Sequence, residues 1–349
     1  MKQPRPVKKI VGKVKATFQK HHDKLWWAHS IYALGLGVGV VILAHRKFHL
    51  VKWLLVALLG LWIGLLIFQR FLATGVEEES RTRKGVKIAF NYIMKNLYQQ
   101  MFFFMIPFYY GATTLGSANM WFLVVITLCA ILSTQDIIFD RYIMENKYLA
   151  SFFYAFCLFA SFNIFLPLLG GVRNIVSLYL SGIFTVVLFS TLHFPVKQLF
   201  TRHGALALVV AMGLFLTLLE WGRSTIPPAP IRQVSSAMAV DRDKKTGKPI
   251  GQFYRIHVDD LKNATLYCFT KIETPLQIKE DIVHVWRKIG RRKPWFEKKF
   301  QTVHSKNEAG VALVSEVSGF PADPVGRWIV EAKTTGGQLI GQTRFLIVR

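Results

Sequence analysis

Acidic residues are scarce in this sequence. Its 20 Asp and Glu stand against 44 Lys and Arg, which gives a formal net charge of +24 at pH 7 and an isoelectric point near 10.1. Such a balance is typical either of nucleic-acid binding or of a membrane protein with cytoplasmic anchors and contacts to anionic lipid. The long apolar runs of the chain favour the membrane protein.

Cysteine is also rare. Cys129 and Cys157 lie within apolar runs, where a thiol behaves as a small buried hydrophobe. Cys268 is alone in the last third of the chain, so no disulfide framework is possible within that part.

The common catalytic signatures are missing. We find no P-loop, no dinucleotide fingerprint and no nucleophile elbow. Three histidines could meet across strands, but without ligand-type spacing: His257, His284 and His304. A triad of Ser315, His284 and Asp259 or Asp260 would lack its usual sequence setting. We therefore expect no catalytic, metal or cofactor-binding residues, and a protein that is not an enzyme.

Long apolar runs fill residues 28–222 and predict an α-helical polytopic membrane domain. A helix needs about 20 apolar residues to cross a bilayer. The runs predict seven transmembrane helices, at roughly 27–44, 51–69, 99–117, 119–134, 149–169, 174–192 and 205–222. The first run lacks a cleavage site and is followed by more spans, so we interpret it as a retained helix.

The distribution of basic residues predicts the orientation. With the N-terminus inside, eighteen Lys and Arg fall in the cytoplasmic tail and loops, and four fall in the opposite loops. Residues 1–27 are then a basic cytoplasmic segment, either an interfacial helix or a disordered anchor. Seven spans place the C-terminal domain outside, in the periplasm if the membrane is a bacterial inner membrane.

Two stretches of the membrane region resemble each other. "YIMKNLYQQMFFF" from Tyr92 and "YIMENKYLASFFY" from Tyr142 match at seven of thirteen positions. We interpret them as the starts of a duplicated helical hairpin, about 92–134 and 142–192, although chance similarity between aromatic-rich helices is the alternative. Parallel repeats of this kind occur in transporters. The polar residues of interest are few: Asn96, Asn146, Asn163 and Glu220. Arg223 follows Glu220 by one turn, which favours a helix-end ion pair over a proton relay.

The remainder of the chain has the pattern of a β domain. "STIPPAP" ends the last span and predicts a Pro-rich linker over 223–231. Residues 232–349 alternate apolar and polar residues in about eight short runs, and the last two runs flank a Gly-Gly turn. This pattern predicts an immunoglobulin-like β-sandwich.

The β region also carries a resemblance to a known family. A strand with Cys268, a strand with His284 and Trp286, and a closing hairpin with Gly326, Trp328, Phe345 and Val348 are similar to the domain of unknown function 2914 family. The membrane region before it is similar to the domain of unknown function 5924 family. The resemblance implies fold and placement, and no activity.

A basic and aromatic stretch, "VHVWRKIGRRKPWF", is the candidate surface for binding. Strand alternation places Trp286 in the core, and a turn after it carries Arg291, Arg292 and Lys293 with Trp295 beside them; with Arg287 and Lys288 these are the candidate surface residues. Outside the cell such a turn suits anionic lipid headgroups, an envelope polymer or a partner protein, and not nucleic acid. The alternative is an ordinary solvated charge run.

These patterns predict a non-enzymatic, multi-pass inner-membrane protein whose periplasmic sandwich serves envelope interaction or anchoring. A transporter or lipid-handling protein built on the duplicated hairpins, and a membrane sensor, remain the alternatives.

Overall fold

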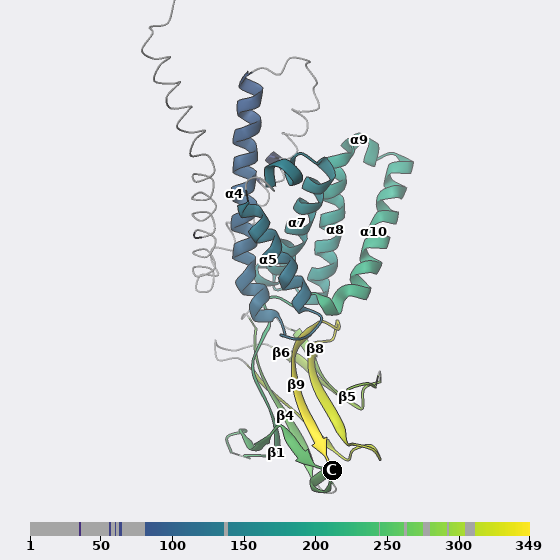
Figure 1. Ribbon diagram of the computed structural model, residues 1–349. Helices are drawn as coiled ribbons and strands as arrows, with labels where there is room; N and C mark the ends of the chain where they lie inside the picture. The colour runs from purple at the N-terminus through teal and green to yellow at the C-terminus, as the bar shows by residue number, and fades with distance from the viewer. Residues whose placement is uncertain are drawn as a thin grey trace, which may run out of the picture.

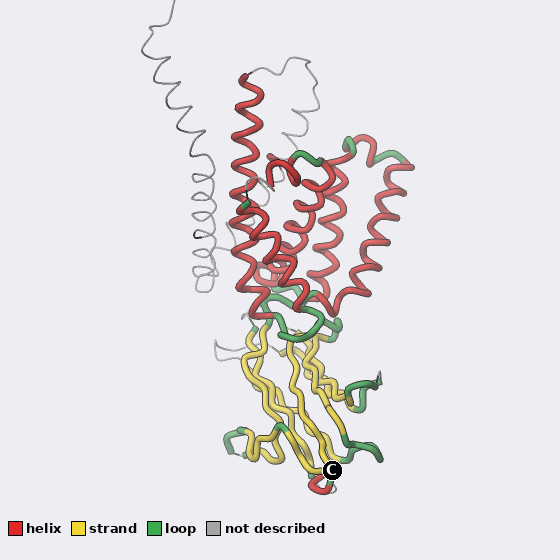
Figure 2. The backbone as a smooth tube through the Cα atoms, viewed as in Figure 1, coloured by secondary structure: helices red, strands yellow, loops and turns green. Residues whose placement is uncertain are grey.

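The computed structural model describes residues 81–135, 139–243, 245–261, 264–274, 280–291, 293–303 and 311–349, together with a few isolated helical positions before residue 81. A helical part lies above a β-sandwich, and the C-terminus lies at the end of the sandwich farthest from the helices (Figures 1 and 2). The predicted basic segment 1–27 falls outside these ranges. The first two predicted spans also fall outside them, except for the isolated helical positions.

The helical part follows the apolar runs. Its elements are α4 (Arg81–Ala112), α5 (Met120–Thr134), the π-helix η2 (Phe139–Met144), α7 (Lys147–Gly170), α8 (Asn174–His193), the short α9 (Val196–Leu199), α10 (Arg202–Gly222) and the 3-10 helix η3 (Arg223–Thr225). The loops 113–119 and 171–173 and the end of α10 all lie on the side of the sandwich (Figure 1).

Three described helices are long and apolar enough to cross a membrane, and the predicted count of seven spans is not supported. They are Tyr148–Gly170, Asn174–His193 and Arg202–Thr225. Helix α5 has only 15 residues, or about 22 Å at 1.5 Å per residue, which is short of the hydrocarbon thickness. Helix α4 has 32 residues, but Lys95, Gln99 and Gln100 interrupt its apolar part.

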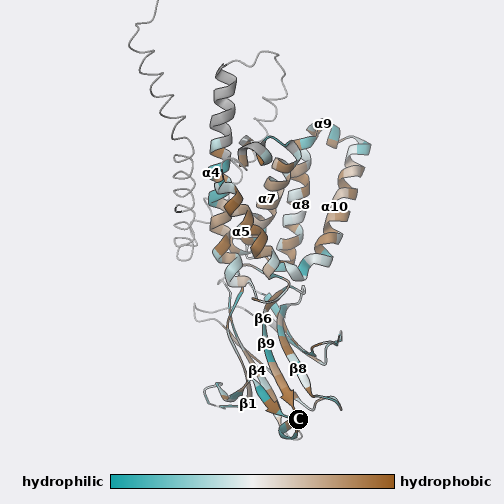
Figure 3. Cartoon of the chain, viewed as in Figure 1, coloured by the Kyte–Doolittle hydropathy of each residue, from teal (hydrophilic) through white to brown (hydrophobic). Residues whose placement is uncertain are grey.

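Burial differs sharply among these three helices. Inside α7, 61% of the apolar window is buried by other parts of the chain, whereas for α10 the share is 6%. The side chains that α10 leaves exposed are large and apolar: Leu206, Val209, Val210, Leu214, Leu218 and Trp221. The apolar surface continues along α10 in Figure 3. A helix of this kind is compatible with a lipid environment.

Helices α4 and α7 pack through aromatic and sulfur-containing side chains. Tyr98, Phe102 and Phe153 meet edge to face, with ring centroids 5.1–5.2 Å apart for the pairs with Phe153. Tyr109 donates a hydrogen bond to the carbonyl of Ala160 at 2.9 Å. Aromatic packing of this density, together with buried hydrogen bonds, holds the two helices in one register.

The two similar stretches are not in similar helical positions. Asn96 lies inside α4, where its amide donates to the Tyr92 carbonyl at 2.8 Å. Asn146 is the N-cap of α7, and its side chain accepts from the backbone of Tyr148 and Leu149. The second stretch begins in the π-helix η2, whereas the first continues a helix that starts at Arg81.

Nine strands form the sandwich in the described part of the chain. They are β1 (Arg232–Arg242), β2 (Pro249–Phe253), β3 (Arg255–His257), β4 (Thr265–Glu273), β5 (Glu280–Lys288), β6 (Phe296–Val303), β7 (Val311–Ser318), β8 (Gly326–Thr334) and β9 (Leu339–Val348), with a 3-10 turn η4 (Asp259–Leu261) after β3. One sheet has the order β2-β1-β4-β7, and the other has the order β3-β9-β8-β5-β6. All described pairs are antiparallel except β3 with β9.

The inward side chains of both sheets share one core. Met238, Cys268 and Val317 come from the first sheet, and Trp286 and Trp328 come from the second. The predicted hairpin around the Gly-Gly turn is confirmed, since β8 and β9 pair on either side of it. The hairpin of β1 with β2 was not predicted, because the stretch between them reads only as a solvated turn.

The stretch predicted as a linker is buried. Ile226 packs with the cluster between α8 and α10, Ala229 belongs to the main helical core, and Ile231 belongs to the sandwich core. Pro227 and Pro228 are also buried. The segment therefore joins the two parts by packing against both, which composition alone does not reveal.

Polar contacts reinforce this junction. Asn119, before α5, donates to the Leu339 carbonyl of β9 at 3.0 Å. Gln338 donates to the Ile226 carbonyl at 3.2 Å. At the start of α8, Arg173 forms an ion pair with Asp281 at 3.3 Å. These contacts hold one end of the sandwich against the helix ends.

Candidate binding surface

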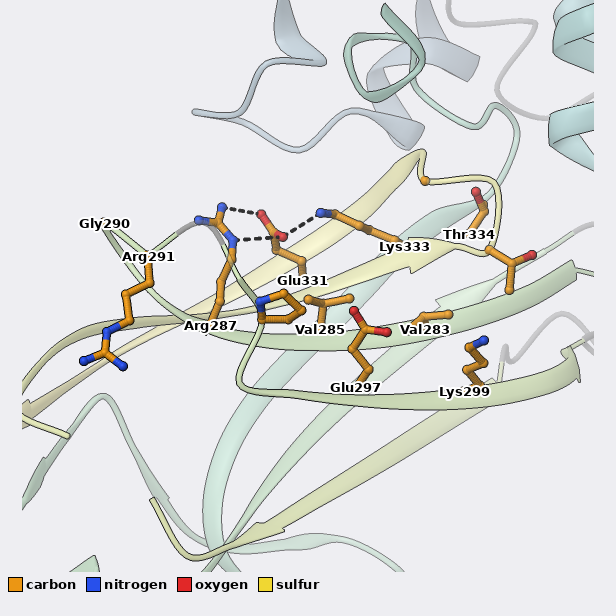
Figure 4. Close-up of a pocket in the computed structure, with 13 residues that line it drawn as sticks. Val283, Val285, Arg287, Gly290, Arg291, Glu297, Lys299, Glu331, Lys333 and Thr334 are labelled. Atoms are coloured by element: carbon orange, nitrogen blue, oxygen red, sulfur yellow. Dashed lines mark hydrogen bonds and ion pairs between the residues drawn. The ribbon is translucent and has the colours of Figure 1, made fainter. Parts of the chain in front are cut away.

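Strand β5 separates a core face from an outer face. Its residues Ile282, His284 and Trp286 point inward, and Trp286 is fully buried as predicted. Val283, Val285 and Arg287 face outward, beside Glu331 and Lys333 of β8 and Glu297 and Lys299 of β6 (Figure 4). Alternation along three adjacent strands thus gathers charged side chains on one surface.

A groove of about 720 Å³ runs along this face. At one end it is lined by the turn after β5, and at the other by the turn between β8 and β9. Its lining residues are Val283, Val285, Arg287, Gly290, Arg291, Pro294, Glu297, Lys299, Glu331, Lys333, Thr334, Thr335 and Gly337. The groove has an apolar floor of Val283 and Val285 and carries four basic and two acidic side chains.

Glu331 organises the middle of the groove. Arg287 donates to both of its carboxylate oxygens, at 2.7 and 3.2 Å, and Lys333 lies 2.7 Å from it. Burial would raise the carboxyl pKa of Glu331, but the hydrogen bonds from Arg287 and Lys333 bring it below its ordinary value. The same carboxylate raises the pKa of Arg287. Arg287 is thus held in a fixed position by a bidentate pair.

The turn after β5 exposes the remaining candidates. Arg291 and Lys293 are exposed, and the Trp295 side chain is 47% exposed. Gly290 has φ 96°, which a residue with a Cβ rarely adopts. Lys288 forms an ion pair with Asp323, with its ammonium 2.9 Å from the carboxylate. Arg292 lies outside the described residues.

The turn lies at the end of β5 opposite to Glu280, and Glu280 contacts α8. Eight residues separate Glu280 from Lys288, or about 26 Å of strand. The turn therefore lies at the end of β5 that points away from the helices (Figure 1).

Ser315 and His284 do meet, but within the core. His284 Nδ1 lies 2.9 Å from Ser315 Oγ, which also accepts from Trp286 Nε1 at 3.0 Å. Both Ser315 and His284 are fully buried, and Asp259 pairs with His257 at 3.2 Å instead. Burial lowers the pKa of His284 to about 4, assisted by the charge of Lys298. The pair is enclosed in the core of the sandwich.

No group of three metal-binding side chains occurs among the described residues, and His304 falls outside them. The polar residues of the helical part have structural partners. Asn163 donates to the Tyr109 hydroxyl at 3.3 Å. Glu220 accepts from the Tyr179 hydroxyl and pairs with Arg223 at 2.7 Å, so the predicted helix-end ion pair is present.

Sequence reasoning missed one buried acid. Glu280, the first residue of β5, is fully buried at the junction and accepts from the backbone N–H of Asn174 at 2.9 Å. The sequence offers no signal for it, because an isolated Glu before an apolar strand reads as an exposed strand end.

Four chains among the solved structures match, and the one described here has a low score. "Pseudomonas fluorescens alkylpurine DNA glycosylase AlkC bound to DNA containing an abasic site analog" shares 10% identity, with 82% of this chain and 86% of that chain covered, at a TM-score of 0.23. A similarity at this score carries no argument about fold or function. Among curated proteins none matches.

Two family models match the sequence. DUF2914, a protein of unknown function, matches residues 279–347. Cys268 lies outside that match, which is shorter than the predicted resemblance. DUF5924, a family of unknown function, matches residues 5–268 and ends inside β4, so the sandwich is divided between the two models. Because residues 5–268 are well over half of the chain, the protein belongs to the DUF5924 family, with a DUF2914 region at its C-terminus.

Proposed function

We propose that this protein is a non-enzymatic, multi-pass inner-membrane protein whose sandwich binds an anionic component of the cell envelope. The observation that carries the proposal is the groove beside β5, with Arg287, Arg291, Lys299 and Lys333 along its walls. The groove belongs to a sandwich that is packed tightly on helices able to cross a membrane. The ligand would thus be held at a set distance from the bilayer.

The distribution of charge along the helices supports a periplasmic sandwich. The ends of the described helices away from the sandwich carry many basic residues: Arg81, Arg83, Lys84, Lys87, Arg141, Lys147, Lys197 and Arg202. The ends next to the sandwich carry Arg173 and Arg223, and both are paired with acids. The positive-inside rule then assigns the sandwich to the outside and the N-terminus to the cytoplasm, which requires an odd number of spans.

The immunoglobulin-like assignment belongs to the same proposal. A buried Trp on β5, a buried Cys on β4 and a short strand β3 parallel to the last strand β9 are arranged as in immunoglobulin-type sandwiches. Such modules commonly bind through an exposed sheet face or through end loops. Both features are combined in the groove and its basic turn.

The position of the turn favours a ligand beyond the protein's own leaflet. Arg291, Lys293 and Trp295 lie at the strand end away from α8. An anionic envelope polymer or glycolipid of a facing layer fits this geometry better than headgroups next to the helices.

The test is binding of fluorescent lipopolysaccharide to the full chain in nanodiscs of neutral lipid. We expect the double variant Arg291→Ala, Lys293→Ala to bind about thirtyfold more weakly, since each basic side chain near an anionic surface contributes about 1 kcal/mol. Raising the salt concentration should weaken binding further.

The matched control is Lys245→Ala with Lys248→Ala, which removes the same charge from exposed positions of the β1–β2 turn. It should bind like the unmodified protein. Equal loss in both double variants would show a nonspecific charge effect and contradict the proposed site. Binding of neutral dextran with equal strength would contradict the anionic class of ligand.

A further inference from the structure

The acid at the junction has unusual surroundings. Glu280 and Asn174 are both fully buried, and they come from β5 of the sandwich and the first turn of α8. One carboxylate oxygen, Oε2, accepts from the Asn174 backbone N–H at 2.9 Å and from its side-chain Nδ2 at 3.5 Å. The contact joins residues 106 positions apart in the sequence.

Two acceptors at this contact have no donor. The second carboxylate oxygen of Glu280, Oε1, and the amide oxygen of Asn174, Oδ1, are buried and lack a hydrogen-bond partner. Buried acceptors without donors are rare and costly in proteins. A carboxylic acid and a primary amide have complementary groups, because the acid donates from one oxygen while the amide donates to the other. One proton on the carboxyl would therefore supply the donor that both oxygens lack.

We propose that Glu280 is a neutral carboxylic acid when the sandwich is seated on α8, so that the seating binds a proton between Glu280 and Asn174. In this arrangement Oε1–H donates towards the amide oxygen, and Oε2 continues to accept from Asn174. The site takes a proton as its ligand and is separate from the groove of the proposed function.

The charges around the site fit a neutral acid. Arg173 is the nearest cation on α8, but it forms an ion pair with Asp281 of β5 at 3.3 Å. On α10, Arg223 is paired with Glu220 and lies against Gly337. Each of these cations thus has its own carboxylate. Burial is the largest influence on Glu280 and raises its carboxyl pKa above the ordinary value, against the opposing hydrogen bonds from Asn174.

The consequence is a junction that depends on pH. An acid with a raised pKa in the folded state stabilises that state at low pH, and the stabilisation is lost as the pH rises through the raised pKa. The seat of the sandwich on the helices should therefore loosen as the surroundings become more alkaline. A change in external pH would then reach α8 directly.

Infrared difference spectroscopy of the full chain in nanodiscs tests the protonation. We expect a carbonyl stretch of a protonated carboxyl that fades as the pH is raised and that is absent in Glu280→Gln. The matched control is Glu331→Gln, which removes a buried carboxylate held by Arg287 and Lys333 and should leave that band in place. A spectrum in which Glu280→Gln removes only an ionised carboxylate band would overturn the proposal and would point to a bound water as the missing donor.

Thermal melting gives a second measurement. Glu280→Gln keeps the shape and stays neutral at every pH, so we expect it to match the unmodified protein at pH 5 and to melt about 3 °C higher at pH 8.5. A variant that melts lower than the unmodified protein by the same amount at every pH would mean that the ionised form is the one that is bound, and would overturn the proposal.

Discussion

In the core of the sandwich, Ser315 accepts a hydrogen bond from Trp286 and shares a second hydrogen bond with His284. A single hydroxyl thereby satisfies an imidazole and an indole that would otherwise be buried without partners. His284 Nε2 remains without a hydrogen-bond partner, so this residue tolerates burial only as a neutral ring. At the scale of residues, the protonation of buried groups is therefore part of the stability of the fold.

The stability of the sandwich should fall between pH 6.5 and about 4 because of His284. The unfolded imidazole binds a proton near pH 6.5, whereas the buried ring does so only near pH 4, so acid favours the unfolded chain. The loss should approach about 3 kcal/mol. In chemical unfolding of the full chain, we expect the free energy of unfolding of His284→Leu to change little over this pH range.

Protonation of Glu280 stabilises the folded state at low pH, which is opposite to the effect of His284. The dependence of stability on pH in each variant is therefore compared with that of the unmodified protein. His257→Gln is the control, because His257 is about half exposed and pairs with Asp259. It should retain the acid-induced fall. An unchanged slope in His284→Leu would contradict the assignment of this fall to the buried ring.

The turn between β8 and β9 and the start of α8 fit closely at the scale of elements. A Cβ built on Gly336 would lie 2.7 Å from Cβ of Ile175. The second glycine, Gly337, has φ 85° and approaches Arg223. Gly-Gly is thus required here for close approach as well as for the turn, and the turn also forms one end of the groove.

Gly336→Ala should destabilise the seat of the sandwich by about 1–3 kcal/mol, the usual cost of overpacking. Its φ lies outside the left-handed region, so space alone decides the effect. Thermal melting should show the loss, and Ile175→Ala in the same chain should recover part of it, because two of the three crowding atoms are removed. Gly213→Ala, where a Cβ meets nothing within 4 Å, should cause no loss. Equal melting of the Gly336 and Gly213 variants would refute the close fit.

The whole molecule is built around one junction. Three connections of the helical part, 113–119, 171–173 and 223–231, contact the same end of the sandwich through Asn119, Arg173 and Ile226. These contacts between residues far apart in the sequence fix the sandwich to the helical part. In the proposed arrangement, the side of the membrane that the sandwich occupies decides which ligands and which pH the protein meets.

Paired reporters fused after Arg349 should report that the C-terminus is outside the cytoplasm. The reason is the excess of basic residues at the helix ends away from the sandwich. One reporter is active only outside and the other only inside, so each fusion serves as the control for the other. An inside signal would contradict the periplasmic assignment, exclude lipopolysaccharide as the ligand, and reopen nucleic acid as a partner.

Local patterns determined much of this protein. Apolar runs predicted α7, α8 and α10 within a few residues, and alternation predicted the strands and the burial of Trp286. These features depend on neighbours in the chain, so a single sequence contains their signal. Of the five spans predicted within the described residues, three are long and apolar enough to cross a membrane, because Lys95, Gln99 and Gln100 interrupt the apolar part of α4 and α5 has only 15 residues.

Only the tertiary structure decided what meets at the junction and in the groove. Glu280 meets Asn174 across 106 positions, and Asn119 meets Leu339 across 220. The residues predicted as a linker are buried between the two cores, and β5 carries the basic turn away from the helices. No local pattern encodes these contacts, because they arise from the packing of whole elements, and that packing determines which polar groups lose water and which charges find partners.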